Sequence, residues 1–135
     1  MFVLDASAAL GLVLGDGDPS FVRGLSNLLT RERVMVPVHW ALEVNNGLWA
    51  ANRRLRLPAA AARRAQQLLL ELPVTIDEST VEKSWTTTFE FAMQLQLTVY
   101  DAAYLELAMR LDAGLATADQ ALAAAAGRLE VRVLA

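Results

Sequence analysis

Five short runs of β-branched and other apolar residues alternate along the chain with longer segments that have helical spacing. The runs are MFVL, RVMVP, PVTI, GLAT and EVRVL, and the segments between them are rich in alanine and leucine. This alternation is typical of an α/β fold, because parallel strands need a crossover helix to bring the chain back in the same direction. The sequence therefore predicts a central, mostly parallel sheet of about five strands flanked by helices.

The length and composition of the chain fit one compact domain. It has 135 residues, of which 55% are hydrophobic, and this is enough apolar material for one substantial core. Two cores would be crowded, and no repeat, low-complexity segment or linker divides the sequence. We therefore expect a single domain over residues 1–135.

The scarcity of soft metal ligands restricts the chemistry that the chain can perform. It has no cysteine and a single histidine, His39, which excludes disulfides, thiolate sites and multi-histidine zinc sites. Any metal must be bound mainly by oxygen, and a reducing, cytoplasmic location fits. The apolar N-terminal stretch lacks a basic leader, is interrupted by Asp5 and is shorter than the roughly 20 residues of a membrane span. We therefore expect no membrane association.

The middle of the chain predicts a helical hairpin. One helical segment runs from about His39 to Arg54 and a second from Pro58 to Leu72, so the two arms could project from the sheet. Residues 79–96 predict one further long helix. Gly114 and Gly127 suit helix ends before the last two strands, because glycine adopts the left-handed conformation that often ends a helix.

Four acidic residues stand at positions that favour a shared site. Asp5 ends the first predicted strand and Asp119 follows the fourth, whereas Asp101 opens the helix before the fourth strand and Glu43 lies one turn into an earlier helix. In an open parallel sheet, ligands bind beyond the carboxyl ends of the strands, where the strand order reverses. Sequence order therefore places Asp5 and Asp119 at such an edge.

Each acid also has a purely structural explanation. Thr98 and Asp101 have the spacing of a capping box, Asp5 and Asp119 can stabilise helix N-termini, and Glu43 can be an ordinary first-turn acid. Capping explains the four acids less well when they are considered together, because converging carboxylates repel one another unless a cation lies among them. Mg²⁺ or Mn²⁺ would resolve that conflict, and such an ion can acidify a bound water for attack on a phosphate.

Four motifs in this order resemble the PIN-domain nucleases, and among them the small VapC-type ribonuclease toxins of toxin–antitoxin pairs. The motifs are LDASAAL, ALEVNNGL, TVYDAAYLELA and LATAD, and the resemblance covers essentially the whole chain. It implies a PIN-like three-layer fold and cleavage of single-stranded RNA. It also implies four acids around one or two Mg²⁺ or Mn²⁺ ions, namely Asp5, Glu43, Asp101 and Asp119.

The resemblance further implies supporting residues and partners. Ser7 and Thr117 would donate hydrogen bonds beside the acids, although capping a helix explains these hydroxyls equally well, and Asn45 is grouped with them. The implied partners are an RNA substrate, a cognate antitoxin protein and a second copy of the chain in a homodimer. His39 is expected to be a capping or surface histidine rather than a catalytic base.

Arginines cluster around the turn of the predicted hairpin, in ANRRLRLPAAAARR. Arg53, Arg54 and Arg56 could hold RNA phosphates, or could simply be solvated at a helix end. Leucines between these arginines could instead indicate a protein partner. The three tryptophans could stack on bases, but packing in the core or an interface is favoured for Trp40, Trp49 and Trp85.

Two other classes of α/β protein with an acid after the first strand are disfavoured. Haloacid-type phosphatases carry a second acid two residues after the first, where this chain has Ser7, and phosphoacceptor receivers need a lysine near the last strand, whereas Lys83 lies well before it. The remaining alternative is a PIN-like domain that binds RNA or a protein without catalysis. The presence of all four acids favours the enzyme.

Overall fold

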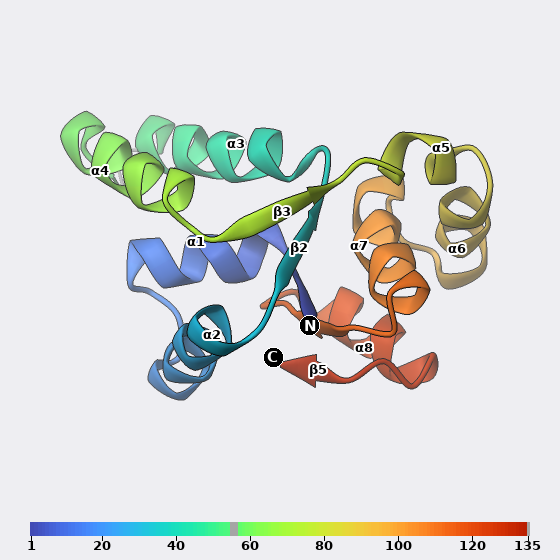
Figure 1. Ribbon diagram of the computed structural model, residues 1–135. Helices are drawn as coiled ribbons and strands as arrows, with labels where there is room; N and C mark the ends of the chain where they lie inside the picture. Colours follow the sequence, from blue (N-terminus) through green and yellow to red (C-terminus); the bar gives the residue numbers. More distant parts are fainter. Residues whose placement is uncertain (55–56, 135) are drawn as a thin grey trace.

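The computed structural model describes residues 1–54 and 57–134 and has a parallel sheet at its centre (Figure 1). The strand order is β3-β2-β1-β4-β5, and all four neighbouring pairs are parallel. This confirms the predicted α/β class and the five predicted strands. The strands are β1 (Phe2–Leu4), β2 (Val34–Pro37), β3 (Val74–Asp77), β4 (Gly114–Ala116) and β5 (Val133–Leu134).

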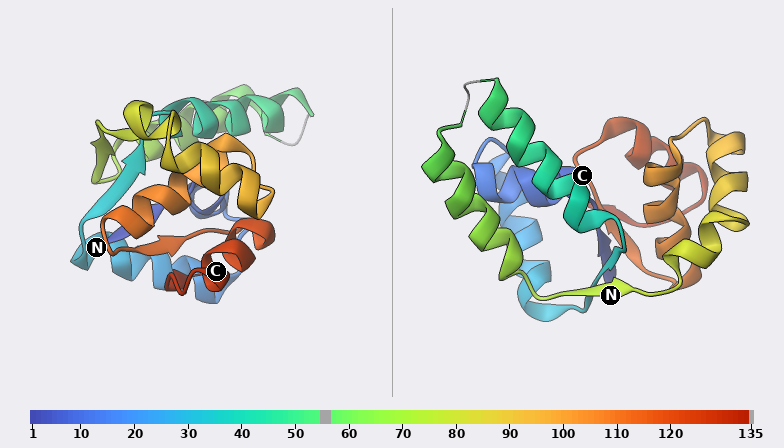
Figure 2. Two further views of the ribbon diagram at one scale, coloured as in Figure 1. Left: turned by 90° about the vertical axis from the view of Figure 1, so that its right-hand side faces the viewer. Right: turned by 90° about the horizontal axis from the view of Figure 1, so that it is seen from above.

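Eight helices of the described residues flank the sheet in two layers. Helices α1 to α4 lie on one side, and α5 to α8 lie on the other (Figure 1, Figure 2). The bounds are α1 (Ala6–Leu14), α2 (Pro19–Arg31), α3 (Trp40–Arg53), α4 (Ala59–Leu70), α5 (Thr80–Ser84), α6 (Thr87–Leu95), α7 (Val99–Arg110) and α8 (Gln120–Arg128). Across the described ranges 1–54 and 57–134, no helix is long and apolar enough to cross a bilayer.

The strand order reverses between β1 and β4. From β1 the chain proceeds outward to β2 and β3, and it then returns to the other side of β1 to form β4 and β5. The carboxyl ends of β1 and β4 therefore lie side by side where the flanking connections diverge. A ligand site is expected at this switch point.

The core lies where β1 meets α7. All three residues of β1 are buried, and seven consecutive residues of α7, Ala102 to Ala108, are buried as well. These include Tyr104, Leu105 and the acid Glu106. Because α7 is buried around most of its circumference, its N-terminus is held rigidly beside the carboxyl end of β1.

Helices α3 and α4 form the predicted hairpin, which extends away from the sheet (Figure 2). Trp40, Val44 and Leu48 recur every fourth residue and form the buried face of α3. Side-chain amides join the arms: Gln66 Nε2 donates to Asn45 Oδ1, and Asn52 Nδ2 donates to the Leu57 carbonyl at 2.8 Å. The hairpin is therefore held by polar contacts as well as by its buried face.

Two local predictions about helices are wrong. Residues 79–96 form two helices, α5 and α6, and not one. The break is at Thr86, which has the non-helical angles φ −133° and ψ −104°. Thr86 is the first of three consecutive threonines, whose β-branched side chains lower helix propensity. Gly114 is the first residue of β4 and Gly127 lies inside α8, whereas the left-handed positions near those helix ends are Asp112 and Glu130. Aspartate tolerates this conformation better than most residues, and nothing in the structure explains the glutamate.

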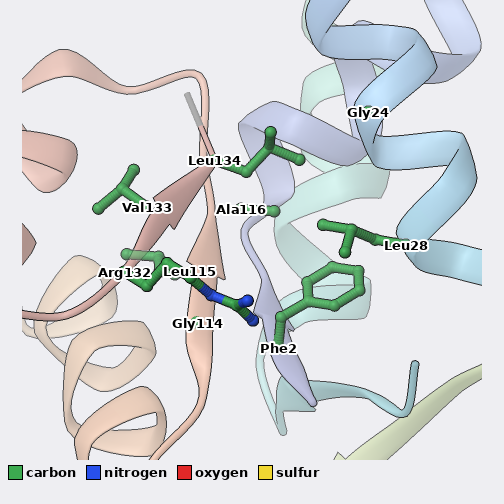
Figure 3. Close-up of a pocket in the computed structure, with 9 residues that line it drawn as sticks. All are labelled: Phe2, Gly24, Leu28, Gly114, Leu115, Ala116, Arg132, Val133 and Leu134. Atoms are coloured by element: carbon green, nitrogen blue, oxygen red, sulfur yellow. The ribbon is translucent and has the colours of Figure 1, made fainter. Parts of the chain in front are cut away.

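A cavity of about 300 Å³ separates α2 from the adjacent strands (Figure 3). Apart from Arg132 at its edge, it is lined by apolar side chains and glycines, including Phe2, Gly24, Leu28 and Leu134. It contains no acidic residue. Because none of the four candidate acids lines this half-open pocket, it bears on the packing of α2 and not on the candidate site.

Two glycines inside helices should respond oppositely to alanine. A Cβ on Gly24 would meet only Leu134, at 3.3 Å, and Leu134 can shift into the cavity. Gly24→Ala should therefore stabilise the protein by about 0.5–1 kcal/mol through helix propensity. A Cβ on Gly47 would lie 2.3 Å from Leu10 Cδ1, with two more Leu10 atoms within 3.3 Å, so Gly47→Ala should destabilise by about 1–3 kcal/mol.

Urea denaturation of the two variants measures this difference. Equal effects of the two substitutions would show that helix propensity alone determines the change in stability. The close approach of α1 to α3 at Gly47 would then not contribute to it.

Candidate active site

Asp5 lies at the switch point, directly after β1, and is 5% exposed. One carboxylate oxygen, Oδ2, accepts hydrogen bonds from Thr117 Oγ1 at 2.7 Å and from Ser7 Oγ. Asp5 is the N-cap residue of α1, but its side chain makes no capping hydrogen bond. The Asp5 charge can still favour the N-terminus of α1, but its carboxylate is held by the Thr117 hydroxyl just after β4 and by the Ser7 hydroxyl of α1.

The same two hydroxyls connect Asp5 to the segment that carries Asp119. Thr117 Oγ1 accepts from the Asp119 N–H at 3.0 Å, and Ser7 Oγ accepts from the Ala118 N–H at 3.0 Å. Each hydroxyl thus donates to Asp5 while accepting from the backbone, so neither can rotate freely. Asp119 Oδ1 caps α8 by accepting from the Leu122 N–H at 2.9 Å, which confirms the capping alternative for one of its oxygens.

Asp101 is the third residue of α7 and completes a capping arrangement with Thr98. Thr98 Oγ1 accepts from the Asp101 N–H at 3.1 Å and donates to Asp101 Oδ2 at 2.8 Å. The predicted cap is therefore confirmed. It does not exclude a second role, because the other oxygen, Oδ1, makes no hydrogen bond within the described residues.

Glu43 projects from the first turn of α3 toward α7, where the Tyr104 hydroxyl donates to its Oε2. His39 Nε2 lies 3.4 Å from the same oxygen, and the His39 ring packs edge-on against Tyr104 with centroids 5.2 Å apart. Tyr104 was not among the site residues predicted from the sequence. A fully buried tyrosine hydroxyl requires a hydrogen-bond partner, and that requirement was the available signal.

Asn45 and Arg53 make their contacts with residues other than these acids. Asn45 donates to the Ala41 carbonyl and accepts from Gln66, so its amide serves the α3–α4 hairpin. Arg53 lies 5.3 Å above the ring of Trp49, Arg54 is exposed, and Arg56 falls outside the described residues.

The tryptophans and His39 differ in burial. Trp40 is buried, as expected for packing, whereas Trp49 and Trp85 are exposed. His39 is the N-cap residue of α3, as the capping expectation has it, but its side chain makes no capping hydrogen bond and is only 15% exposed. Its ring fills the space between Glu43 and two tyrosines, Tyr100 and Tyr104.

Burial and mutual repulsion disfavour the ionised form of the acids. Burial raises the pKa of Asp5, and the charge of Asp101 raises it further, against the opposing effect of the Ser7 and Thr117 hydroxyls. Burial also raises the pKa of Glu43, with added repulsion from Asp5 and Asp101. Burial lowers the pKa of His39, so the histidine does not supply a compensating charge near neutral pH. Asp5, Glu43 and Asp101 therefore form a site that a cation would stabilise.

The donor chemistry of these acids fits a hard divalent cation. All the donors are carboxylate oxygens, which suit Mg²⁺ and Mn²⁺. Within residues 1–54 and 57–134, however, no three acidic or imidazole groups converge closely enough to hold an ion directly. This arrangement suits Mg²⁺, which commonly binds one or two carboxylates and keeps several waters.

We expect the stability effect of Asp5→Asn to depend on pH. A raised folded-state pKa contributes stability that is fully present below the unfolded value of 3.8 and is lost as the pH rises through the folded pKa. Asparagine removes this titration and can still accept a hydrogen bond from Thr117. Near pH 7 and without metal, the variant should be at least as stable as the wild type.

This advantage should shrink as the pH falls toward about 4, and urea denaturation at the two pH values measures it. An advantage that grows on acidification would contradict a raised pKa of Asp5.

Comparison with known proteins agrees with the resemblance seen in the sequence. Residues 2–128 match the family model described as the PIN domain. VapC ribonuclease Mb0985 from Mycobacterium bovis and Ribonuclease VapC9 from Mycobacterium tuberculosis are each 37% identical over 121 residues, which cover 88% of this chain and 86% of each relative. The crystal structure of PAE2754 from Pyrobaculum aerophilum aligns with a TM-score of 0.71 at 25% identity, covering 98% of this chain and 83% of that chain. On fold, motif order and relatives alike, this chain belongs to the PIN-domain family.

Proposed function

We propose that this protein is a metal-dependent endoribonuclease that hydrolyses phosphodiester bonds of RNA, and that the whole chain acts as one domain. The observation that carries the proposal is the group of three mutually repelling acids, Asp5, Glu43 and Asp101, at the switch point of the sheet. A protein does not gain stability by burying such charges, so their arrangement favours a bound cation. Relatives named as ribonucleases support RNA as the substrate.

The roles of the individual residues follow from their contacts. Asp5 would be the best-ordered ligand, because Ser7 and Thr117 fix its carboxylate. Asp101 and Glu43 would hold the ion directly or through water, and the Tyr104 hydroxyl keeps Glu43 turned toward α7. Asp119 would contribute the oxygen that does not cap α8. When bound, Mg²⁺ or Mn²⁺ supplies an acidified water and neutralises charge on the phosphoryl oxygens.

We further propose that the protein is the toxin of a toxin–antitoxin pair and works in the cytoplasm as a homodimer. The relatives are named VapC, and the VapC-type proteins that the sequence motifs resemble are toxins of toxin–antitoxin pairs. Large apolar side chains exposed on α5, on α6 and in the turn between them support association with a second copy, since extensive apolar surface is rarely left open to water. These residues are Val81, Trp85, Phe89 and Met93, exposed by 59%, 84%, 50% and 66%.

The test is cleavage of short single-stranded RNA by the purified protein, with Mg²⁺, with Mn²⁺ and with a chelator. We expect cleavage only with the metals, and RNA fragments that arise from internal sites. A protein that binds RNA but leaves it intact under every condition would favour the catalytically silent PIN-like domain instead.

The arginines of the hairpin give a separate prediction. Replacing Arg53 and Arg54 by alanine should weaken RNA binding and reduce the slope of log K against log salt by up to about 1.4, because each phosphate that an arginine neutralises on a single strand contributes about 0.7. Binding should be measured at several salt concentrations without metal. The matched control replaces Arg31 and Arg128, which are exposed at the ends of α2 and α8. Equal slopes for both double variants would assign the hairpin arginines to solvent or a protein partner.

A further inference from the structure

A cavity of about 360 Å³ opens beside Asp119, at the junction of α1, α2 and α8. Its floor is apolar and includes Gly11, Gly17 and Phe21 with two alanines, and its polar groups are Asp18, Asp119 and Gln120. The volume lies within the roughly 300–1,000 Å³ typical of sites for small ligands. We call this space the Asp119 pocket.

The Asp119 pocket adjoins the acid site through covalent and hydrogen-bonded links. Ala118 and Asp119 line the pocket, and their N–H groups donate to the Ser7 and Thr117 hydroxyls that hold Asp5. A group bound in the pocket would therefore lie next to a phosphate bound at Asp5. This continuity connects the pocket to a polymeric substrate rather than to an unrelated small molecule.

The charges of the pocket decide which part of that substrate can enter. Asp18 and Asp119 both line the pocket and are exposed, so their negative charges would repel a phosphate group. A nucleobase has no charge, presents flat apolar faces to the glycines and alanines, and offers N–H groups to acceptors. The pocket chemistry therefore suits a base and disfavours the RNA backbone.

Asp18 is a rigid acceptor for such a base. Its Oδ1 accepts hydrogen bonds from the Ser20 and Phe21 N–H groups and from the Ser20 hydroxyl, which orients the carboxylate, and these bonds lower the pKa of Asp18. The ionised group has no proton to donate, and its Oδ2 makes no hydrogen bond within the described residues. The Gln120 side chain is exposed and can both donate and accept.

We propose that the Asp119 pocket binds the nucleobase adjacent to the scissile phosphate and selects bases that carry an exocyclic amino group. The inference rests on the proposed ribonuclease activity and deepens it by assigning a base-reading subsite. Adenine, guanine and cytosine can each present an exocyclic amino group to Asp18 Oδ2, whereas uracil offers only its N3–H, which lies between two carbonyl oxygens that the carboxylate repels. Cleavage should therefore be weaker when uracil occupies the adjacent position.

The test is sequencing of the cleavage sites that the wild type and its variants produce in a library of short RNAs with randomised bases. The wild type should disfavour uracil at one position beside the cut, by about threefold to tenfold for one hydrogen bond. Asp18→Asn keeps an effective helix cap but replaces the acceptor by an amide that can donate. This variant should reduce or reverse the discrimination against uracil.

A second variant blocks the pocket physically. Gly11 lines the pocket and a Cβ there would meet only Gly17 Cα, at 3.9 Å, so Gly11→Leu adds side-chain volume at the wall of the pocket and should favour helix formation. It should abolish the base preference. The matched control is Gly127→Leu, because Gly127 lies inside α8, outside the pocket, and its Cβ would meet nothing within 4 Å. The control should retain the wild-type preference.

The outcomes separate this inference from the proposed function. If the wild type cleaves no RNA with either metal, the ribonuclease proposal fails and the pocket assignment falls with it. If the wild type cleaves without a base preference, or if Gly11→Leu and Asp18→Asn keep the wild-type preference, the pocket does not read a base, although the nuclease proposal stands.

Discussion

Asp101→Asn should reduce RNA cleavage by at least about 100-fold while leaving the metal-free protein as stable as the wild type, or more stable. Replacing groups that merely support metal ligands commonly costs 10–100-fold, so loss of a ligand should cost at least as much. Stability should persist because the asparagine amide oxygen can keep the Thr98 hydrogen bond, and Thr98 remains the N-cap of α7. It should rise where repulsion from Asp5 and Glu43 is relieved.

Thermal unfolding with and without Mg²⁺ and a cleavage assay should be run side by side. Binding of metal to the folded wild type should raise its melting temperature, and most of that shift should be absent in Asp101→Asn. Asp112→Asn is the matched control, since Asp112 is exposed near the opposite end of α7. A folded and active Asp101→Asn protein would show that Asp101 is only a helix cap.

Arg110→Met should destabilise the protein by about 3 kcal/mol, the lower end of the range for breaking a buried ion pair. Arg110 donates to Asp77 Oδ2 at 2.8 Å and to Glu106 Oε1 at 2.8 Å, and these carboxylate side chains are only 8% and 5% exposed. The substitution leaves both acids buried without a cation. We use the lower end because the arginine side chain is itself 25% exposed.

The loss should be smaller in acid. Burial alone would raise the pKa of Asp77, but hydrogen bonds from Arg110 and Thr80 lower it overall. The stabilisation is therefore present above the unfolded value of 3.8 and is lost as the pH falls through the folded pKa. Urea denaturation near pH 7 and near pH 3 tests both statements, with Arg128→Met at the exposed end of α8 as the control. An effect near pH 7 no larger than that of the control would show that the Arg110 network does not stabilise β3 and α7.

The elements of the fold were predictable because their signals are local. Runs such as RVMVP contain apolar residues that a buried strand requires, and Trp40, Val44 and Leu48 repeat at the helical period. The ends and interruptions of the helices were less predictable. The division of residues 79–96 at Thr86 and the left-handed residue Asp112 depend on how the chain must turn to pack against its neighbours, and the sequence contains no glycine at either point.

The candidate site likewise combines features that follow from the local sequence and contacts that depend on tertiary packing. By itself the sequence determined which acids follow strands or open helices, because Asp5, Asp101 and Asp119 owe those places to chain order and helix capping. Only the tertiary structure decided that Thr117 bonds to Asp5, 112 residues away, that Tyr104 bonds to Glu43, 61 residues away, and that Asn45 turns instead to Gln66. Such contacts depend on the packing of α7 between the sheet and its neighbouring helices, and on the requirement that each buried hydroxyl find a partner. That requirement can be met by many residues in the chain, and only the packing selects which one is near enough.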